Sequence, residues 1–295
     1  MRVAVFGLGS MGYGMAASLV RAGHQVWGLD VNPGPVARFR AEGGQQDDPD
    51  PARLEAVVCV VLNAAQTEAV LFGEAGIVPG LGAGAVVVSC ATVPPGFARD
   101  MEARCARAGV HYLDAPISGG AAKAAAGQLS VMAAGTPQAF AAARPVLDAT
   151  AATVFALGDA AGPGSAMKAV NQLLAGVHIA AMAEALTFGM TQGVAPRQFL
   201  DVISKCAGTS WMLENRAPHI VDGDYTPRSS VNIWPKDLGI VLDIARGAGF
   251  DAPLTETALA RFRAAAAMGL GAEDDAAVAK VYARQAGLRL PGEDA

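Results

Sequence analysis

A lysine and two carboxamide residues stand close together in the apolar stretch that follows Gly162-Pro163-Gly164. Asn171 and Gln172 come three and four residues after Lys168, so a helix would carry all three side chains on one face. A lysine near a helix start lies at the unfavourable end of the helix dipole, and no acidic residue within a turn compensates it. One interpretation is an exposed lysine whose methylene chain covers apolar surface. The other is a buried amine that acts as a general acid or base, while Asn171 orients a reacting hydroxyl.

A second chemical pattern is the glycine spacing at the start of the chain. Gly7, Gly9 and Gly12 give G-x-G-x-x-G between an apolar run at residues 1–6 and a helix-like segment at 15–21. In a dinucleotide-binding βαβ unit the first glycine permits a tight turn, and the second lets the cofactor pyrophosphate approach the backbone. The third lets helix and strand pack closely. The phosphates would then lie at the N-terminus of the helix.

An aspartate completes this pattern. Asp30 ends the next predicted strand, eighteen residues after Gly12, where a carboxylate can accept hydrogen bonds from the adenosine ribose hydroxyls. Its charge would repel a 2′-phosphate, and residues 31–34 offer no cation to bind one. Arg38 and Arg40 come later, on the helix that we expect to follow. The sequence therefore favours NAD over NADP.

Two further segments carry polar groups at the ends of predicted elements. The segment 114–120 follows a predicted strand, and ligands bind at the carboxyl ends of strands in open α/β sheets. Its Ser118 offers a hydroxyl, and Gly119 and Gly120 offer close-lying N–H groups that suit a substrate carboxylate or hydroxyl. Lys236 falls in the first turn of a helix that begins near Trp234. Taken alone, a plain turn and an exposed helix cap explain these segments as well as a site does.

Composition excludes several classes of function. The 295 residues are 52% hydrophobic and 17% charged, with a net charge of −5, whereas nucleic-acid binding needs clustered Lys and Arg. No signal peptide and no uninterrupted apolar run of membrane-spanning length is expected. The four histidines lack metal-ligand spacing, so we expect no metal. The four isolated cysteines indicate free thiols in a reducing cytoplasm.

The order of predicted elements indicates the fold class. Up to about residue 160, short β-rich runs alternate with helix-like segments, which predicts a doubly wound, mostly parallel Rossmann-type sheet. After Gly162 a helix of some twenty residues, with apolar positions at three-and-four spacing, leads into further helices. We therefore expect an NAD-binding domain over residues 1–162 and an all-helical domain over 163–295, with a frayed tail from Gly287. The expected strands are Val3–Phe6, Gln25–Leu29, Ala56–Leu62, Ala85–Ser89, His111–Asp114, Leu129–Ala133 and Thr153–Ala156.

Together these motifs make the chain resemble the β-hydroxyacid dehydrogenase (3-hydroxyisobutyrate dehydrogenase-like) family. The matching segments are the glycine loop 7–12, residues 114–120 leading into 127–132, Gly162-x-Gly164-x-x-x-Lys168-x-x-Asn171, and Lys236-Asp237-Leu238. The resemblance implies an NAD(P)-dependent oxidoreductase whose helical domain mediates assembly into a homodimer or homotetramer. It also implies a small hydroxy acid as substrate. Many relatives have a second asparagine where this chain has Gln172.

The resemblance implies roles for individual residues. Lys168 would be the catalytic general acid/base, and Asn171 would help to position the substrate. The implied cofactor contacts are Gly7, Leu8, Gly9, Ser10, Met11, Gly12, Asp30, Leu62, Asn63, Thr92 and Lys236. The implied substrate contacts are Ser118, Gly119, Gly120, Asn171, Gln172, Trp211 and Lys236. Within the family, the segments 210–219 and 223–227 most resemble the L-threonate-oxidising branch, with Asn215 and Arg216 as further specificity elements.

Alternative functions stay open at this point. The nearest is a dehydrogenase for 3-hydroxyisobutyrate, or a reductase for 2-hydroxy-3-oxopropanoate (tartronate semialdehyde). An imine reductase shares the fold, but such enzymes generally lack the lysine. A non-catalytic dinucleotide-binding protein is a remote alternative, because a protein of that kind would be expected to lose the amine of Lys168.

Overall fold

The computed structural model describes residues 1–293 as two compact units, each of which is described here by itself. The first unit is Met1–Lys168, and the second begins at Ala169. The division falls inside the longest helix, α7 (Pro163–Thr191), directly after Lys168.

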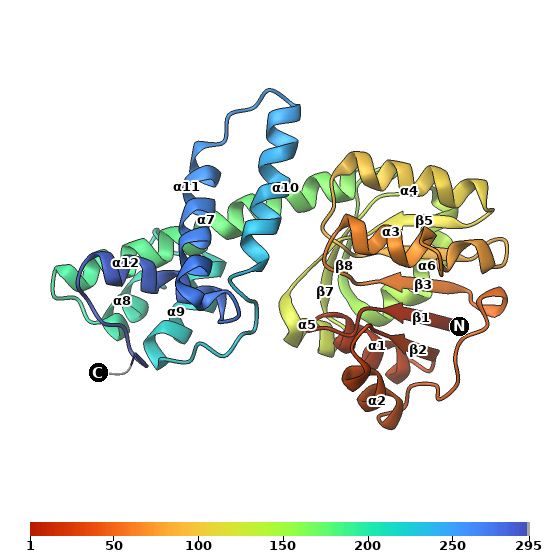
Figure 1. Cartoon of the computed structure of the whole chain (residues 1–295), viewed down its shortest axis with the longest axis horizontal. Helices are drawn as coiled ribbons and strands as arrows, with labels where there is room; N and C mark the ends of the chain where they lie inside the picture. The colour runs from red at the N-terminus through yellow and green to blue at the C-terminus, as the bar shows by residue number, and fades with distance from the viewer. Residues whose placement is uncertain (294–295) are drawn as a thin grey trace. The chain divides into compact units, whose positions relative to one another are not determined.

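The first unit is built on a five-stranded parallel sheet in the order β2-β1-β3-β4-β5 (Figure 1). Its strands are short and apolar: β1 (Arg2–Phe6), β2 (Gln25–Leu29), β3 (Ala56–Cys59), β4 (Val86–Ser89) and β5 (His111–Asp114). The chain moves outward from β1 to β2 and then returns to β3 on the other side of β1. Loops after β1 and β3 therefore meet at the point where strand order reverses, which is where open α/β sheets bind ligands.

Helices cover both faces of this sheet because alternate strand residues point to opposite sides. Val3 and Val5 of β1 pack in a cluster with residues of α1 (Gly12–Arg21) and α6 (Pro137–Thr150). Ala4 belongs to the opposite cluster, with residues of α3 (Ala64–Phe72) and α4 (Pro95–Arg107). The short α2 (Pro33–Ala41) adds the buried Phe39 to the first cluster. The doubly wound, mostly parallel fold is confirmed.

The later strands form a separate small sheet instead of extending the first one. Here β6 (Ile117–Ser118) pairs antiparallel with β7 (Leu129–Ala133), which pairs parallel with β8 (Ala151–Ala156). A single antiparallel bridge joins Asp114 to Ala134. The chain turns at Pro116, because proline has no N–H to continue a ladder, and then reverses into β6. Neither β6 nor the alanine-rich α5 (Gly120–Ala126) is among the elements expected from the sequence, because both are too short to show a periodic pattern.

Up to Glu293, the second unit consists of helices and loops around one apolar core, with a single β-bridge between Ser230 and Asp274. Besides the greater part of α7, its helices are α8 (Pro196–Ile203), α9 (Trp211–Asp222), α10 (Ile233–Gly247), α11 (Pro253–Ala265) and α12 (Ala279–Gln285). A short helical turn at Ala266–Leu270 directly follows α11, and another at Asp275–Val278 directly precedes α12. The rings of Trp234 and Phe262 stack in the core at 5.4 Å between centroids. Ser210 caps α9 by accepting the Leu213 N–H at 3.1 Å.

The tail and the longest helix each bear on an expectation from the sequence. The tail from Gly287 is not frayed over the part of the chain that the structure describes, because Leu290 is buried in the helical core. Residues 294–295 of that tail lie outside the described residues. Helix α7 is long and apolar enough to cross a membrane by length and composition, with a mean hydropathy of 1.5 over an 18-residue window. A core helix of a soluble protein passes the same test, so this finding is weak evidence for a membrane span.

Candidate active site

The glycine loop after β1 fits a dinucleotide. Gly7 has φ +93°, and a Cβ there would lie 2.3 Å from the Val60 carbonyl oxygen. A Cβ on Gly12 would lie 1.9 Å from the Gly7 carbonyl oxygen. Both positions therefore require glycine for the close packing of β1, β3 and α1. Gly9 differs, because no heavy atom of the described chain lies within 4 Å of its Cβ position, which leaves room for a phosphate to approach.

The start of α1 suits an anion. The helix has no acidic residue in its first turn, and within residues 1–293 no side chain caps its N-terminus. The positive end of the helix dipole therefore faces the loop without a carboxylate in the first turn of the helix. Ser10 and Met11, the remaining predicted contacts of this loop, lie directly before Gly12.

Asp30 is held beside the glycine loop at the end of β2. Its Oδ2 accepts the Leu8 N–H at 2.6 Å, and its Oδ1 accepts the Asn32 N–H at 2.8 Å. Both later arginines have partners elsewhere on or beside α2. The Arg38 guanidinium lies 3.7 Å from the centre of the Tyr13 ring, and Arg40 pairs with Asp48 at 3.0 Å.

The predicted contacts after β3 and β4 lie at the same sheet edge. Asn63 caps α3 by accepting the Gln66 N–H at 2.9 Å, and Leu62, just before it, is 59% exposed. Thr92 follows β4 and is partly buried. Because all five strands are parallel, these loops and the glycine loop share the carboxyl edge of the sheet.

Asp114 fixes the start of α7 against the end of β5. Its buried carboxylate accepts the N–H groups of Gly162 and Ser165 at 2.9 Å each and the Ser165 hydroxyl at 2.6 Å. Burial raises the pKa of Asp114 by more than these hydrogen bonds lower it. A Cβ on Gly164 would lie 2.5 Å from the Met132 carbonyl oxygen, so only glycine allows this approach. The residues between Gly162 and Lys168 thus position the start of α7 against β5.

Lys168 is a buried amine beside the segment 117–120. Its side chain is 9% exposed, and Nζ donates to the Ile117 carbonyl oxygen at 2.8 Å. The interpretation as an exposed, snorkelling lysine is therefore wrong. Ser118, Gly119 and Gly120 follow Ile117 directly, and the two glycines have φ values of +136° and +78°. The first unit thus brings the amine next to the loop that we expect to bind substrate.

The helical unit links the other predicted polar residues by two hydrogen bonds and an ion pair. The Asn171 Nδ2 donates to Gln172 Oε1 at 2.9 Å, and Gln172 Nε2 donates to Asp237 Oδ2 at 2.5 Å. Lys236 Nζ lies 2.6 Å from Asp237 Oδ1. Gln172 and Asp237 are 8% and 2% exposed, so this series of contacts is largely closed to solvent. The role of Asp237 in joining Lys236 to Gln172 was not predicted from the sequence, because Gln172 lies sixty-five residues away from it.

The specificity elements on α9 have different surroundings. Trp211, the first residue of the helix, is 55% exposed. Arg216 pairs with the fully buried Asp275, with Nε 2.5 Å from Oδ1, and also donates to Asn215. Trp234 Nε1 donates to the same carboxylate at 3.0 Å. The Arg216 guanidinium is thus held in a structural ion pair.

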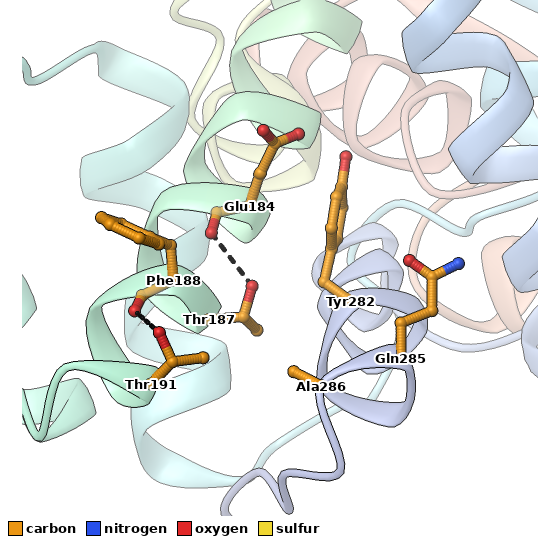
Figure 2. A pocket seen from close by; sticks show the side chains of 7 residues that line it. All are labelled: Glu184, Thr187, Phe188, Thr191, Tyr282, Gln285 and Ala286. Carbon is orange, nitrogen blue, oxygen red and sulfur yellow. Dashed lines mark hydrogen bonds between the residues drawn. The ribbon is translucent and has the colours of Figure 1, made fainter.

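A pocket in the helical unit contains none of the predicted site residues. Figure 2 shows this pocket, of about 270 Å³, with Tyr282 standing across from α7. Its threonine hydroxyls bond to carbonyl groups within α7, as Thr187 does to Ala183 at 2.8 Å and Thr191 to Phe188 at 2.6 Å. Burial and the neighbouring Glu184 raise the pKa of Tyr282 to about 12. The lining is Glu184, Thr187, Phe188, Thr191, Tyr282, Gln285 and Ala286.

The cysteines and acidic groups offer no competing chemistry in the described range. Cys59, Cys90 and Cys105 are buried thiols, and burial raises the pKa of Cys59 to about 12. Cys206 is exposed. Between Met1 and Glu293, no group of three His, Cys, Asp or Glu side chains is placed to hold a metal ion.

Two protein-family models match consecutive parts of the chain. Residues 2–158 match the model described as the NAD-binding domain of 6-phosphogluconate dehydrogenase. Residues 162–282 match the model described as NAD-binding of NADP-dependent 3-hydroxyisobutyrate dehydrogenase. The two models together cover nearly the whole chain.

Individual relatives are similar over their full length. The chain is 49% identical to L-threonate dehydrogenase of Cupriavidus necator, covering 99% of this chain and 98% of that protein. It is 46% identical to L-threonate dehydrogenase of Pectobacterium atrosepticum, covering 98% and 95%. Among solved structures, 3-hydroxyisobutyrate dehydrogenase from Salmonella typhimurium superposes with a TM-score of 0.89 at 44% identity, covering 95% of this chain and 99% of that one.

Proposed function

This chain belongs to the 3-hydroxyisobutyrate dehydrogenase-like family of NAD(P)-binding hydroxy acid dehydrogenases, and on that premise we propose that it is an NAD-dependent L-threonate dehydrogenase. The observation that carries the chemistry is the buried amine of Lys168 beside the segment 117–120. Support for the substrate comes from relatives named L-threonate dehydrogenase that are 46–49% identical over nearly the whole chain.

The proposed cofactor is NAD, held by the first unit. The open space at Gly9 and the uncapped start of α1 suit the pyrophosphate. The Asp30 carboxylate, held next to Leu8, suits a ribose with free hydroxyls and repels a 2′-phosphate. Arg38 and Arg40 support this choice, because each already has a partner. Leu62, Asn63 and Thr92 are the further proposed contacts along the same sheet edge.

In the proposed mechanism Lys168 accepts the hydroxyl proton of the substrate as its carbinol carbon becomes a carbonyl. Bound NAD supplies the acceptor for the hydride that leaves the same carbon. The Lys168 amine must enter this step unprotonated, so oxidation should slow at low pH. Its bond to the Ile117 carbonyl fixes Nζ before substrate arrives, and such prior positioning is a large part of enzymatic rate enhancement.

The remaining residues serve binding in this proposal. Ser118, Gly119 and Gly120 bind the substrate carboxylate or a hydroxyl, and Asn171 orients the reacting group. Gln172, Trp211 and Lys236 complete the proposed substrate contacts, with Lys236 also touching the cofactor. The proposed domains are 1–162 for NAD and 163–295 for substrate and assembly into a homodimer or homotetramer. The isolated cysteines, three of them buried, fit a cytoplasmic enzyme.

A substrate panel with NAD tests the proposal. The purified protein should oxidise L-threonate with a higher kcat/KM than 3-hydroxyisobutyrate, and should use NADP less well than NAD. The rival substrate is 3-hydroxyisobutyrate, because the 44% identical Salmonella protein is named as its dehydrogenase. Preference for that acid, or for reduction of 2-hydroxy-3-oxopropanoate, would reject L-threonate as the substrate and keep the reaction class.

A further inference from the structure

The carboxylate of Asp237 is the most buried polar group among the site residues of the helical unit, at 2% exposure. It contacts two side chains at once: Lys236 Nζ at 2.6 Å from Oδ1 and Gln172 Nε2 at 2.5 Å from Oδ2. Gln172 in turn accepts from Asn171 Nδ2 at 2.9 Å. Asn171, Gln172 and Asp237 thus form a hydrogen-bonded series, called here the amide relay.

The chemistry of a carboxylate gives the amide relay a direction. An ionised carboxylate only accepts hydrogen bonds, so Gln172 must turn its NH₂ group toward Asp237. Its carbonyl oxygen then faces Asn171 and accepts from that residue's NH₂ group. Asn171 is left with its own carbonyl oxygen directed away from Gln172. One buried charge therefore decides whether the Asn171 carbonyl oxygen is offered to a ligand or accepts a hydrogen bond from Gln172.

We propose that Asp237 is a positioning residue that makes Asn171 present a hydrogen-bond acceptor to a substrate hydroxyl, while it holds Lys236 in place. The inference rests on the proposed function, in which Asn171 orients the reacting group one helical turn after Lys168. The reacting hydroxyl has a single proton, which Lys168 accepts, so the hydroxyl that donates to Asn171 is a neighbouring one of the polyhydroxylated acid, and Asn171 orients the reacting carbon through it. The relay is built by Gln172, whose longer side chain spans the distance between Asn171 and the Asp237 carboxylate.

The near-isosteric variant Asp237→Asn should reverse the relay. The Lys236 ammonium would keep the amide oxygen of the new side chain, which turns its NH₂ group toward Gln172. Gln172 must then offer its oxygen there and its NH₂ group to Asn171, so that Asn171 presents a donor. We expect kcat for hydroxy acid oxidation to fall about ten- to a hundredfold, the scale of a misplaced reacting group.

The double variant Gln172→Glu with Asp237→Asn should restore the direction. Here the amide introduced at position 237 donates to the carboxylate introduced at position 172, which still accepts from Asn171, and the net charge of the pair is unchanged. We expect it to recover about tenfold of the lost kcat. The matched control is Asp243→Asn, on the same helix but exposed and paired with Arg246, which should leave kcat and KM within twofold of the parent.

A readout without substrate or cofactor separates this inference from the proposed function. In protein labelled with ¹⁵N at Asn and Gln side chains, the NH₂ signals of Asn171 and Gln172 should both move in Asp237→Asn, and that of Asn171 should return in the double variant. Gln172→Met identifies the Gln172 signal and also breaks the relay if Asp237→Asn does not fold. A wild type inactive on every hydroxy acid would reject the proposed function, whereas the amide signals would still decide the relay.

Two results would overturn the inference. One is an Asp237→Asn variant with unchanged amide signals and a kcat within twofold of the parent. The other is a folded double variant no more active than Asp237→Asn, since a purely structural role for the carboxylate predicts loss without recovery.

Discussion

The two units position their chemical groups by different means. In the first unit the backbone does so: Gly7, Gly12 and Gly164 let segments approach within distances that no Cβ would allow. In the helical unit side chains do so, through the bonds that link Asn171 and Gln172 to Asp237. Backbone placement tolerates almost no substitution, whereas a side-chain network can be reversed or rebuilt by paired changes.

The largest effect on turnover is expected at Lys168, whose amine is held by the Ile117 backbone carbonyl. Lys168→Ala removes the proposed base, so turnover should drop by about 10² to 10⁴ while NAD binding survives, because the glycine loop is untouched. Steady-state kinetics and a cofactor titration by nicotinamide fluorescence measure the two quantities. Lys205→Ala, at an exposed lysine of the helical unit, is the control. Turnover that stays near the wild-type value would remove Lys168 from the mechanism.

A pair of glycine variants separates the needs of the fold from those of the cofactor. Gly12→Ala puts a Cβ 1.9 Å from the Gly7 carbonyl oxygen, so it should lower the free energy of unfolding by about 1–3 kcal/mol and abolish NAD binding. Gly9→Ala meets no described atom, so apo stability should change by less than about 0.5 kcal/mol while NAD affinity falls. Thermal unfolding and NAD titration test both variants. Equal loss of apo stability in the two would contradict the assigned roles.

The sequence predicts features that depend on local patterns, but not those that depend on contacts between distant residues. Glycine spacing, short apolar strands and the helix of Lys168 are local patterns, so the Rossmann-type fold and the helical second part were predictable. The separate sheet of β6, β7 and β8 was not, because Leu129–Ala133 reads the same whether it extends one sheet or begins another. The side-chain bonds of Asp114 and the bond between Asp237 and Gln172 join residues 48 to 65 positions apart, and no local pattern predicts a pairing of that kind.

A smaller effect is expected for cofactor choice. Asp30→Ala removes the acceptor of the Leu8 N–H and the proposed partner of the ribose, so NAD affinity should fall about tenfold. NADP binding should fall less or improve, because the repulsion of its 2′-phosphate is gone. The ratio of kcat/KM with the two cofactors measures the change, and Asp148→Ala, at an exposed aspartate of α6, is the control. An unchanged ratio would show that Asp30 does not set the preference.

The smallest effect concerns two buried carboxylates, one in each unit, whose pKa values are shifted in opposite directions. Their contributions to stability should therefore depend on pH in opposite ways. Burial raises the pKa of Asp114, so the folded protein holds that proton more tightly than the unfolded chain, and its contribution to stability is lost as pH rises through the raised pKa. Burial also acts on Asp274, but bonds from His219 and from the N–H groups of Arg228 and Ala276 outweigh it and lower its pKa. Its contribution is lost as pH falls through that lowered pKa.

Between about pH 3 and 6, the Tm deficit of Asp114→Asn relative to the wild type should shrink as pH rises, and the deficit of Asp274→Asn should grow. Deficits that change in the same direction would show that one of the two carboxylates is held by other forces than those described.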